Sequence, residues 1–185
     1  MIWHHIIWWH MIKLDQKCVA LLKRTGAYDE RTLECMRLCF ELLTLTTAID
    51  RDCASRLGAH GVSEGKFVLL FLLSDTKDGL SPHELAEQAG VTRGTITGLL
   101  DGLERDGHVD RHSHGEDRRK LVVRLTPKGR RLARELTATH GRWIASLFSD
   151  FSEAERASLR RLLAKAYAGT DAGRASLKGS DDDRT

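Results

Sequence analysis

The stretch from Leu80 to Gly129 constrains the fold of this 185-residue chain more than any other part of it. Ser81, followed at once by Pro82 and three residues later by Glu84, is the pattern of a helix N-terminus closed by a capping box. Gly90 supplies the left-handed residue with which such a helix commonly ends. We therefore expect a short helix and a sharp turn at the start of this stretch.

A second helix is predicted directly after the turn, with Thr92 as its N-cap. Apolar side chains then recur at the spacing of one helical face, at Ile96, Leu99, Leu100 and Leu103. We expect this face to pack inward. The opposite face carries one long side chain and otherwise only short ones, at Arg93, Gly94, Thr95, Thr97, Gly98 and Asp101.

Beyond Gly107 the pattern changes to extended chain. His108–His112 and Leu121–Leu125 are two β-like runs, and the polar segment 113–120 between them is predicted to be a loop. Helix, turn, helix and hairpin in this order make a winged helix-turn-helix. The sequence therefore predicts a mainly α-helical fold with a small β-hairpin wing.

Helical patterns flank this stretch on both sides. The amino-terminal patterns run from Trp3 to about Arg24 and from about Glu30 to Leu57. The second of these would be on the order of 40 Å long, and its wide apolar surface is more than one chain can cover. We expect a partner subunit to cover it.

The carboxy-terminal side begins at Thr126, an N-cap followed by proline, and its first helix runs to about Phe148. Ser152 with Glu155 is another capping box, and it starts a last helix through Ala166. From Thr170 the chain has almost no apolar residues, which predicts a disordered tail. We divide the chain into amino-terminal helices (1–62), a winged helix-turn-helix region (63–126), carboxy-terminal helices (127–169) and a tail (170–185).

Charge is distributed unevenly along the chain. The whole chain carries +3, whereas residues 91–134 hold eleven Lys and Arg against six Asp and Glu, a net +5, which leaves −2 for the rest. A basic stretch of this kind suits a partner rich in phosphate, such as DNA. No nucleophile motif or phosphate-binding loop is present, so we expect neither an enzyme nor a cofactor.

The compartment is predicted from what the sequence lacks. Met1–Ile12 is apolar, but it has no basic start and no small-residue cleavage site, and no stretch approaches the roughly 20 apolar residues of a spanning helix. The four cysteines include no Cys-x-x-Cys pair, so neither a disulfide framework nor a structural zinc site is indicated. We expect a cytoplasmic protein with no membrane partner and no metal.

The stretch from about Leu80 to Leu132 resembles the MarR (multiple antibiotic resistance regulator) family of bacterial winged-helix repressors. The wing, E-D-R-R-K-L-V-V-R-L-T-P-K-G, carries Asp117 and Arg119 two residues apart, followed by an L-T-x-x-G helix start. The resemblance implies a homodimer whose terminal helices intertwine. It also implies a repressor that binds a palindromic, inverted-repeat operator in double-stranded DNA.

Candidate DNA contacts fall on the second helix and the wing. Arg93, Thr95 and Thr97 are placed to meet base edges in the major groove, while Arg119 should enter the minor groove with Asp117 holding it in position. The alternatives are a solvated helix face and a hairpin that is merely charged. The full set of predicted contacts is Ser81, Thr92, Arg93, Thr95, Thr97, Arg111, Asp117, Arg118, Arg119 and Lys120.

A candidate effector site lies near the amino terminus, where His4, His5, Trp8 and Asp15 interrupt an apolar helical stripe. Burying them without partners would cost a few kcal/mol each, so they pair with one another, lie near solvent, or line a ligand cavity; a capping, dimer-stabilising helix is the alternative. The resemblance implies a small aromatic or heteroaromatic carboxylate as the releasing effector. The family's urate-responsive branch has an Asp and an Arg where this chain has Val68 and Leu99, so urate itself is not expected.

Two other kinds of sensor and one other class of protein are the alternatives to a repressor released by a small molecule. A redox-sensing repressor would need a low-pKa cysteine, whereas Cys35, Cys39 and Cys53 suggest small buried hydrophobes. A metal sensor is disfavoured because the histidines near the amino terminus lack a complete ligand set. The competing class is a ligand-independent, architectural DNA-binding protein.

Overall fold

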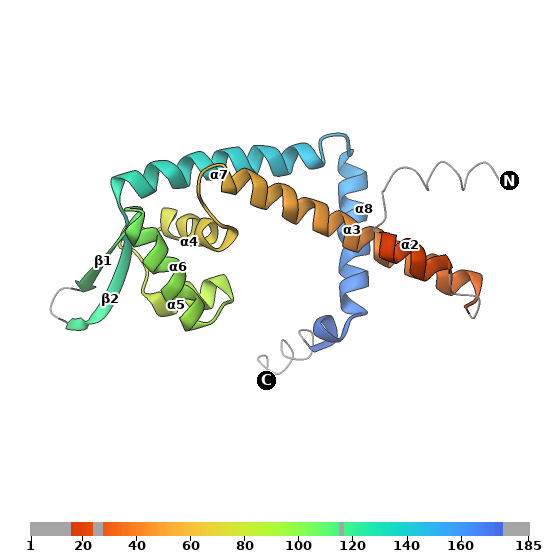
Figure 1. Ribbon diagram of the computed structural model, residues 1–185, viewed down its shortest axis with the longest axis horizontal. Helices are drawn as coiled ribbons and strands as arrows, with labels where there is room; N and C mark the ends of the chain where they lie inside the picture. Colours follow the sequence, from red (N-terminus) through yellow and green to blue (C-terminus); the bar gives the residue numbers. More distant parts are fainter. Residues whose placement is uncertain (1–15, 24–27, 115–116, 176–185) are drawn as a thin grey trace. The chain divides into compact units, whose positions relative to one another are not determined.

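Residues 16–23, 28–114 and 117–175 are those that the structure, a computed structural model, describes (Figure 1). Candidate residues His4, His5, Trp8 and Asp15 therefore lie outside the described residues. The elements in chain order are α2 (Gln16–Lys23), α3 (Glu30–Gly58), α4 (Glu64–Ser74), α5 (Pro82–Ala89), α6 (Arg93–Arg105), β1 (Val109–His114), β2 (Asp117–Leu125), α7 (Pro127–Leu147) and α8 (Glu153–Ala168).

The chain divides into two compact units, residues 1–136 and 137–185. The first contains α2 to α6, the hairpin and the start of α7; the second contains the rest of α7, and α8. This mainly helical architecture with one small antiparallel sheet confirms the predicted fold class.

The predicted helix ends of the central stretch are confirmed. The Ser81 backbone N–H donates to the Glu84 carboxylate at 2.7 Å, and the Ser81 hydroxyl accepts from the Glu84 N–H at 3.2 Å. Gly90 ends α5 with φ 65°, in the left-handed region. Thr92 then caps α6 by accepting from the Thr95 N–H. Local side-chain bonds thus fix both helices of the motif.

The core of the first unit lies under α6. Ile96, Leu100 and Leu103 on its inner face are all buried, as predicted from their spacing. They join a cluster of buried residues from the surrounding elements that includes Leu57, Leu69, Leu70, Leu73, Leu85, Val109, Val123 and Ala133. Each fully buried aliphatic side chain contributes about 1.5–3 kcal/mol to folding. The core therefore fixes which face of α6 is turned outward.

The wing is longer than the sequence predicted. β1 continues to His114 and β2 begins at Asp117, so the predicted loop at 113–120 is wrong, and antiparallel pairing reaches His114↔Asp117 beyond a register shift after Ser113. The reason is that a strand pair is held by backbone hydrogen bonds, which polar residues make as well as apolar ones.

At the base of the wing, Leu80 forms an isolated bridge with Val123. The preceding residue, Gly79, has φ +81°, and a Cβ there would lie 2.3 Å from the Val123 carbonyl oxygen. Glycine is therefore required where the chain approaches β2.

Helix α3 buries little of its apolar surface within the chain. Leu57 is its one buried residue, while Leu38 and Leu43 are 58% and 57% exposed. Cys35 and Cys39 are exposed, so the prediction that they are buried is wrong within the single chain, whereas Cys53 is half-buried and packs against the core. An apolar helical pattern shows that a face is suited to burial and not which chain covers it.

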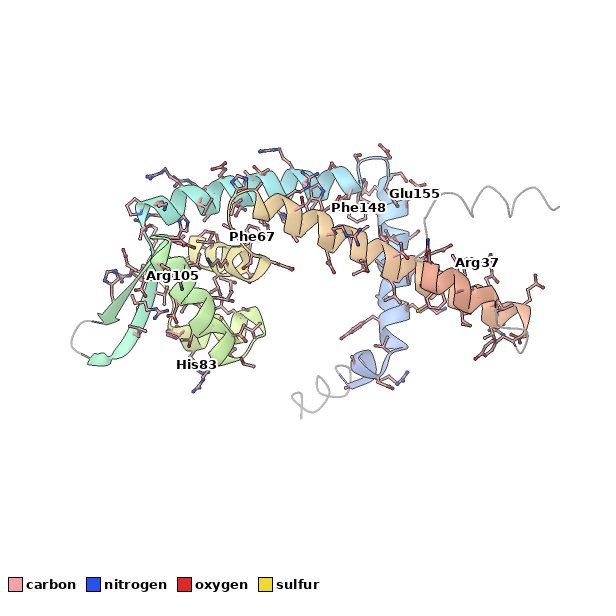
Figure 2. The ribbon with its side chains drawn as sticks, in the orientation of Figure 1. Arg37, Phe67, His83, Arg105, Phe148 and Glu155 are labelled. Atoms are coloured by element: carbon pink, nitrogen blue, oxygen red, sulfur yellow. The ribbon has the colours of Figure 1, made fainter. Side chains whose placement is uncertain are left out.

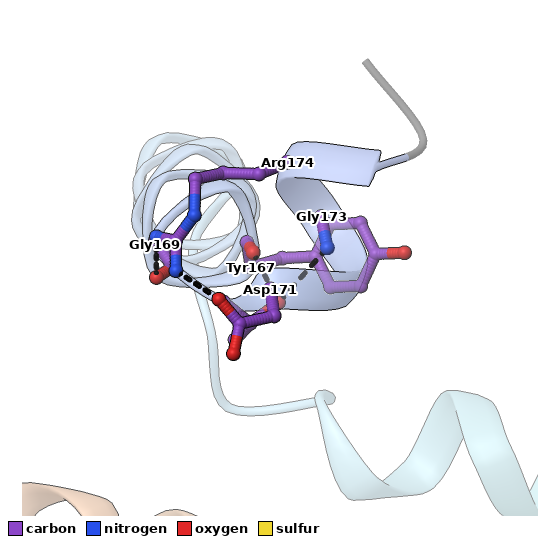
Figure 3. Close-up of polar contacts among 6 residues, drawn as sticks. Tyr167, Gly169, Asp171, Gly173 and Arg174 are labelled. Carbon is purple, nitrogen blue, oxygen red and sulfur yellow. Dashed lines mark hydrogen bonds and ion pairs between the residues drawn. The ribbon is translucent and has the colours of Figure 1, made fainter. Parts of the chain in front are cut away.

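In the second unit, the capping box of Ser152 with Glu155 is confirmed. Helix α8 buries none of its residues, and the chain after it closes a further turn (Figure 3). There the Gly173 N–H donates to the Thr170 hydroxyl at 3.0 Å, and Arg174 donates to the Gly169 carbonyl and pairs with Asp171. The helical turn at 171–175 lies within the segment that we assigned to the tail.

Among the described helices, none is long and apolar enough to cross a membrane.

Candidate DNA-binding surface

The outer face of α6 is a surface of short side chains. Its members are all exposed: Arg93, Gly94, Thr95, Thr97, Gly98 and Asp101. A Cβ added at Gly98 would meet no atom within 4 Å, and one at Gly94 would meet only the Thr92 hydroxyl oxygen, at 3.9 Å. Neither glycine is therefore required by packing within the chain.

The threonine hydroxyls on this face are bonded within the helix. The Thr97 hydroxyl donates to the Arg93 carbonyl at 3.0 Å. The Thr92 and Thr95 hydroxyl oxygens lie 2.9 Å apart, so that one of the two hydroxyls donates to the other. Because the Thr97 proton is used, that side chain offers a methyl group and an oxygen lone pair to an incoming molecule. A methyl group contacts the C5 methyl of thymine favourably.

Arg93, by contrast, is exposed at the first position of α6, and the described residues include no ion pair for it. Its guanidinium is therefore available to a base edge or a phosphate. Arg105, labelled in Figure 2, is a second exposed arginine at the other end of the same helix.

Ser81 is the N-cap of α5, and its hydrogen bonds are made with Glu84. Its backbone N–H serves the Glu84 carboxylate, and these bonds with Ser81 hold the pKa of Glu84 below its usual value. The ionised carboxylate places negative charge at the start of α5, where a phosphate would otherwise be favoured. Among the predicted contacts, Ser81 is thus engaged with Glu84 through both its backbone N–H and its side chain.

Arg111 lies on β1, and its guanidinium is turned toward α6. Its Nη2 lies 2.5 Å from Asp101 Oδ1, and its Nε lies 3.6 Å from Glu104 Oε2. The side chain is only 22% exposed. The structure therefore places this predicted DNA contact in an ion pair within the chain.

The remaining predicted contacts lie on the wing. Asp117, Arg118, Arg119 and Lys120 form the start of β2, and the positions of their side chains are outside the description. Arg124, nearer the base, donates from Nε to the Asp78 carbonyl at 2.8 Å and so anchors the wing to the segment before α5.

A second ion pair holds the inner side of α6, and the sequence did not indicate it. Lys66 Nζ on α4 lies 2.6 Å from Asp106 Oδ2, just after α6, and this bond holds the pKa of Asp106 below its usual value. Lys128 on α7 donates to the Asp106 carbonyl at 2.7 Å. The pairs join residues far apart in sequence, so periodicity carries no signal for them.

A shallow, mainly apolar hollow lies beside α6, lined by Glu64, Gly65, Val68, Leu69, Ala89, Val91 and Leu99. It includes Val68 and Leu99, the two residues for which we do not expect urate as the effector. Its one charged lining residue is the acidic Glu64.

Among the described residues, the Cys53 thiol is poorly suited to sensing oxidants. Burial, together with the carboxylates of Glu64 and Asp50, raises the pKa of Cys53, which makes its thiol less reactive. Within residues 16–23, 28–114 and 117–175, no group of three or more His, Cys, Asp or Glu is placed to hold a metal ion.

Comparison with known proteins gives consistent matches. A model of the MarR family matches residues 60–120. The chain is 38% identical over 129 residues to the HTH-type transcriptional repressor YetL of Bacillus subtilis (strain 168), covering 69% of this chain and 77% of YetL. It is 33% identical over 113 residues to the HTH-type transcriptional regulator TtmR of Methylorubrum extorquens (strain PA1), covering 61% of this chain and 57% of TtmR.

Solved structures show the same fold. Streptococcus pneumoniae FabT in complex with DNA is similar with a TM-score of 0.62 and 24% identity, covering 71% of this chain and 93% of FabT. The Staphylococcus aureus MepR–DNA complex has a TM-score of 0.60 and 22% identity, covering 69% of this chain and 94% of MepR. The relatives are regulators of transcription, in agreement with the expectation that this chain is not an enzyme.

Proposed function

Because the chain belongs to the MarR family of transcriptional regulators, we propose that it is a repressor that binds an inverted-repeat operator as a homodimer and is released by a small molecule. One observation carries the DNA-binding part. The outer face of α6 is exposed and carries mainly short side chains, while its inner face is buried in the core. Such a helix enters a major groove without rearranging.

We assign the reading of bases to α6, which we call the recognition helix. Arg93 would contact guanine, and Thr95 and Thr97 would contact thymine methyl groups. On the wing, Arg119 would enter the minor groove with Asp117 orienting it, and Arg118 and Lys120 would contact phosphates. Neighbours of the same fold that were solved in complex with DNA support DNA as the partner.

The homodimer is proposed from apolar surface that the chain leaves uncovered. On α3, Leu38 and Leu43 are more than half exposed, and on α8 so are Leu162 and Tyr167. Burying one leucine side chain contributes about 1.5–3 kcal/mol, so a partner subunit that covers these helices is strongly favoured. A two-fold dimer in turn requires a two-fold DNA site.

The effector is proposed on two grounds that lead to different ligands. If His4, His5, Trp8 and Asp15 line its site, a small aromatic or heteroaromatic carboxylate fits, with Trp8 stacking on the ring and a histidine binding the carboxylate. If the hollow beside the recognition helix is the site, a neutral apolar molecule fits better, because a carboxylate would face Glu64. Val68→Trp would fill the hollow, whereas Trp8→Ala would remove the stacking partner.

The operator is tested by selecting duplexes from a random pool with the full chain. We expect an inverted repeat with half-site centres about one helical turn apart. Enrichment of no sequence would favour the ligand-independent architectural protein instead. On the selected site, Arg93→Ala should lose about 1–3 kcal/mol of discrimination within the half-site, while Arg119→Ala should lose affinity mainly at A·T-rich flanks.

The dimer is tested by sedimentation. Leu43→Lys should dissociate the wild-type dimer, whereas Leu121→Lys, a matched exposed leucine on the wing, should leave it intact. A folded wild-type monomer at micromolar concentration would contradict the proposal.

The sensor is tested by adding a candidate inducer to the DNA complex. If the Trp8→Ala and His5→Ala proteins stay bound to DNA when the inducer is added, the effector site lies on the amino-terminal helix. If the Val68→Trp protein stays bound instead, the site is the hollow. If the cysteines sense oxidants, replacing Cys35 and Cys39 by serine would abolish release by peroxide.

A further inference from the structure

Arg111 occupies the point at which the wing leaves the body of the first unit. In the register of the hairpin it is paired with Val123, a fully buried residue that also bridges to Leu80. The strands beyond this point, toward residues 114 and 117, have no further bridge to the rest of the described chain. Arg111 is therefore placed where a side-chain contact sets the direction of the wing.

The partners of Arg111 both belong to the recognition helix. Asp101 and Glu104 are three residues apart and so lie on one side of α6. Arg111 Nη2 is 2.5 Å from the first carboxylate, and Nε is 3.6 Å from the second. The guanidinium thus links the wing strand to the helix beside it.

We propose, on the basis of the proposed DNA-binding function, that Arg111 is a positioning residue rather than a DNA contact. It holds the base of the wing against the recognition helix through Asp101, so that both elements meet the DNA as one rigid surface. Without it, the wing tilts relative to α6, and the wing tip no longer matches the minor groove beside the half-site.

The charges at this site support a positioning role. Two carboxylates of the recognition helix share one guanidinium, so the trio already carries one uncompensated negative charge. Turning Arg111 toward a phosphate would leave both carboxylates unpaired next to the DNA backbone. The guanidinium is thus held more favourably where it is.

The experiment measures sequence discrimination with the duplex selected by the wild-type full chain. Affinities are compared for this duplex, for one substituted inside the half-site and for one whose A·T flank is substituted. For wild type, flank substitution should weaken binding roughly tenfold, within the range of a mismatched position. We call the affinity for the selected duplex divided by that for the flank-substituted duplex the flank ratio, and define the half-site ratio in the same way. Arg111→Ala should bring the flank ratio close to one while leaving the half-site ratio unchanged.

Asp101→Ala distinguishes the two roles by itself. A positioning role predicts that it also loses flank discrimination, although it removes a negative charge from the DNA-facing side, and that the double variant loses no more than either single variant. The matched control is Arg105→Ala, an exposed arginine of α6 with no ion pair among the described residues. It should keep the flank ratio. Like Arg111→Ala it removes one positive charge, but it leaves the Arg111–Asp101 ion pair intact.

The contrary result is equally specific. If Arg111 contacts a phosphate, Arg111→Ala weakens binding equally on every duplex and lowers the salt slope by about one, while Asp101→Ala keeps the flank ratio. That outcome overturns the inference. Because affinity ratios do not depend on the folded fraction, a partly unfolded variant still decides the question. Failure of the wild type to select any duplex would instead refute the proposed function.

Discussion

Gly98 sits in the middle of the recognition helix at a position where glycine is unfavourable. Glycine in a helix interior costs about 0.5–1 kcal/mol relative to alanine. A Cβ at this position would meet no atom of the chain within 4 Å. Gly98→Ala should therefore raise the free energy of unfolding by nearly the full difference in helix propensity, about 1 kcal/mol.

DNA affinity should change in the opposite direction. If the outer face of α6 packs closely against base edges, a methyl group at residue 98 is an addition to a packed interface, and such additions cost about 1–3 kcal/mol. We expect at least a fivefold loss of operator affinity from a variant that is more stable in the absence of DNA.

Two measurements at fixed protein concentration test this reasoning. Urea denaturation gives stability as a shift in midpoint at unchanged slope, and fluorescence anisotropy at fixed salt gives operator affinity. The control is Gly102→Ala on the same helix, whose Cβ would lie 2.7 Å from Lys66 Cε; it should gain less stability, because Lys66 must move, and keep its DNA affinity. A stabilised Gly98→Ala protein that binds the operator like wild type would refute close packing of this face on DNA.

Three further results are expected. Thr97→Val should keep operator affinity and Thr97→Ser should lose it, because the hydroxyl is bonded to Arg93 and the methyl is left to contact DNA; equal losses would show that the hydroxyl is read. Gly129→Ala should lower the free energy of unfolding by about 3 kcal/mol or more, since its Cβ would lie 1.9 Å from the His108 carbonyl oxygen, and urea denaturation measures this. Burial, followed by the charge of Lys128, lowers the pKa of His108 below its usual value of 6.5. Because the unfolded chain then binds more protons than the folded chain, the free energy of unfolding should fall as the pH drops through that lowered pKa. His108→Gln should show a smaller fall in urea titrations over this range.

The helix ends of the central motif were predictable because their signals are local. The bond from the Thr92 hydroxyl to the Thr95 N–H, and the reciprocal bonds of Ser81 with Glu84, join residues three apart. Sequence alone contains everything that such a bond requires. The inward face of α6 was predictable for a similar reason, since helical periodicity fixes which side chains share a side.

The length of the wing and the environment of α3 were not predictable in the same way. Strand pairing between Ser113 and Leu121 depends on the register of two backbones, and their polar neighbours leave no apolar alternation to reveal it. The exposure of Cys35 and Cys39 depends on whether the covering surface comes from this chain or from another. A helical stripe carries no information on that point.

Arg111 shows why a basic stretch overstates the number of DNA contacts. Four of the basic residues in 91–134 have partners within the chain. Arg111 forms an ion pair with Asp101 of α6. The other three donate to backbone carbonyls: Arg124 to that of Asp78, Lys128 to that of Asp106, and Arg130 to that of Leu125, at 2.7 Å. Arg124, Lys128 and Arg130 still contribute to the positive field that attracts DNA at long range, because pairing with a carbonyl leaves the charge intact. Contact with a phosphate requires a group that is free to turn, and these four of the eleven basic residues in the stretch are already engaged within the chain. Long-range attraction therefore follows from composition, whereas the contacts follow from which cations the fold has already used.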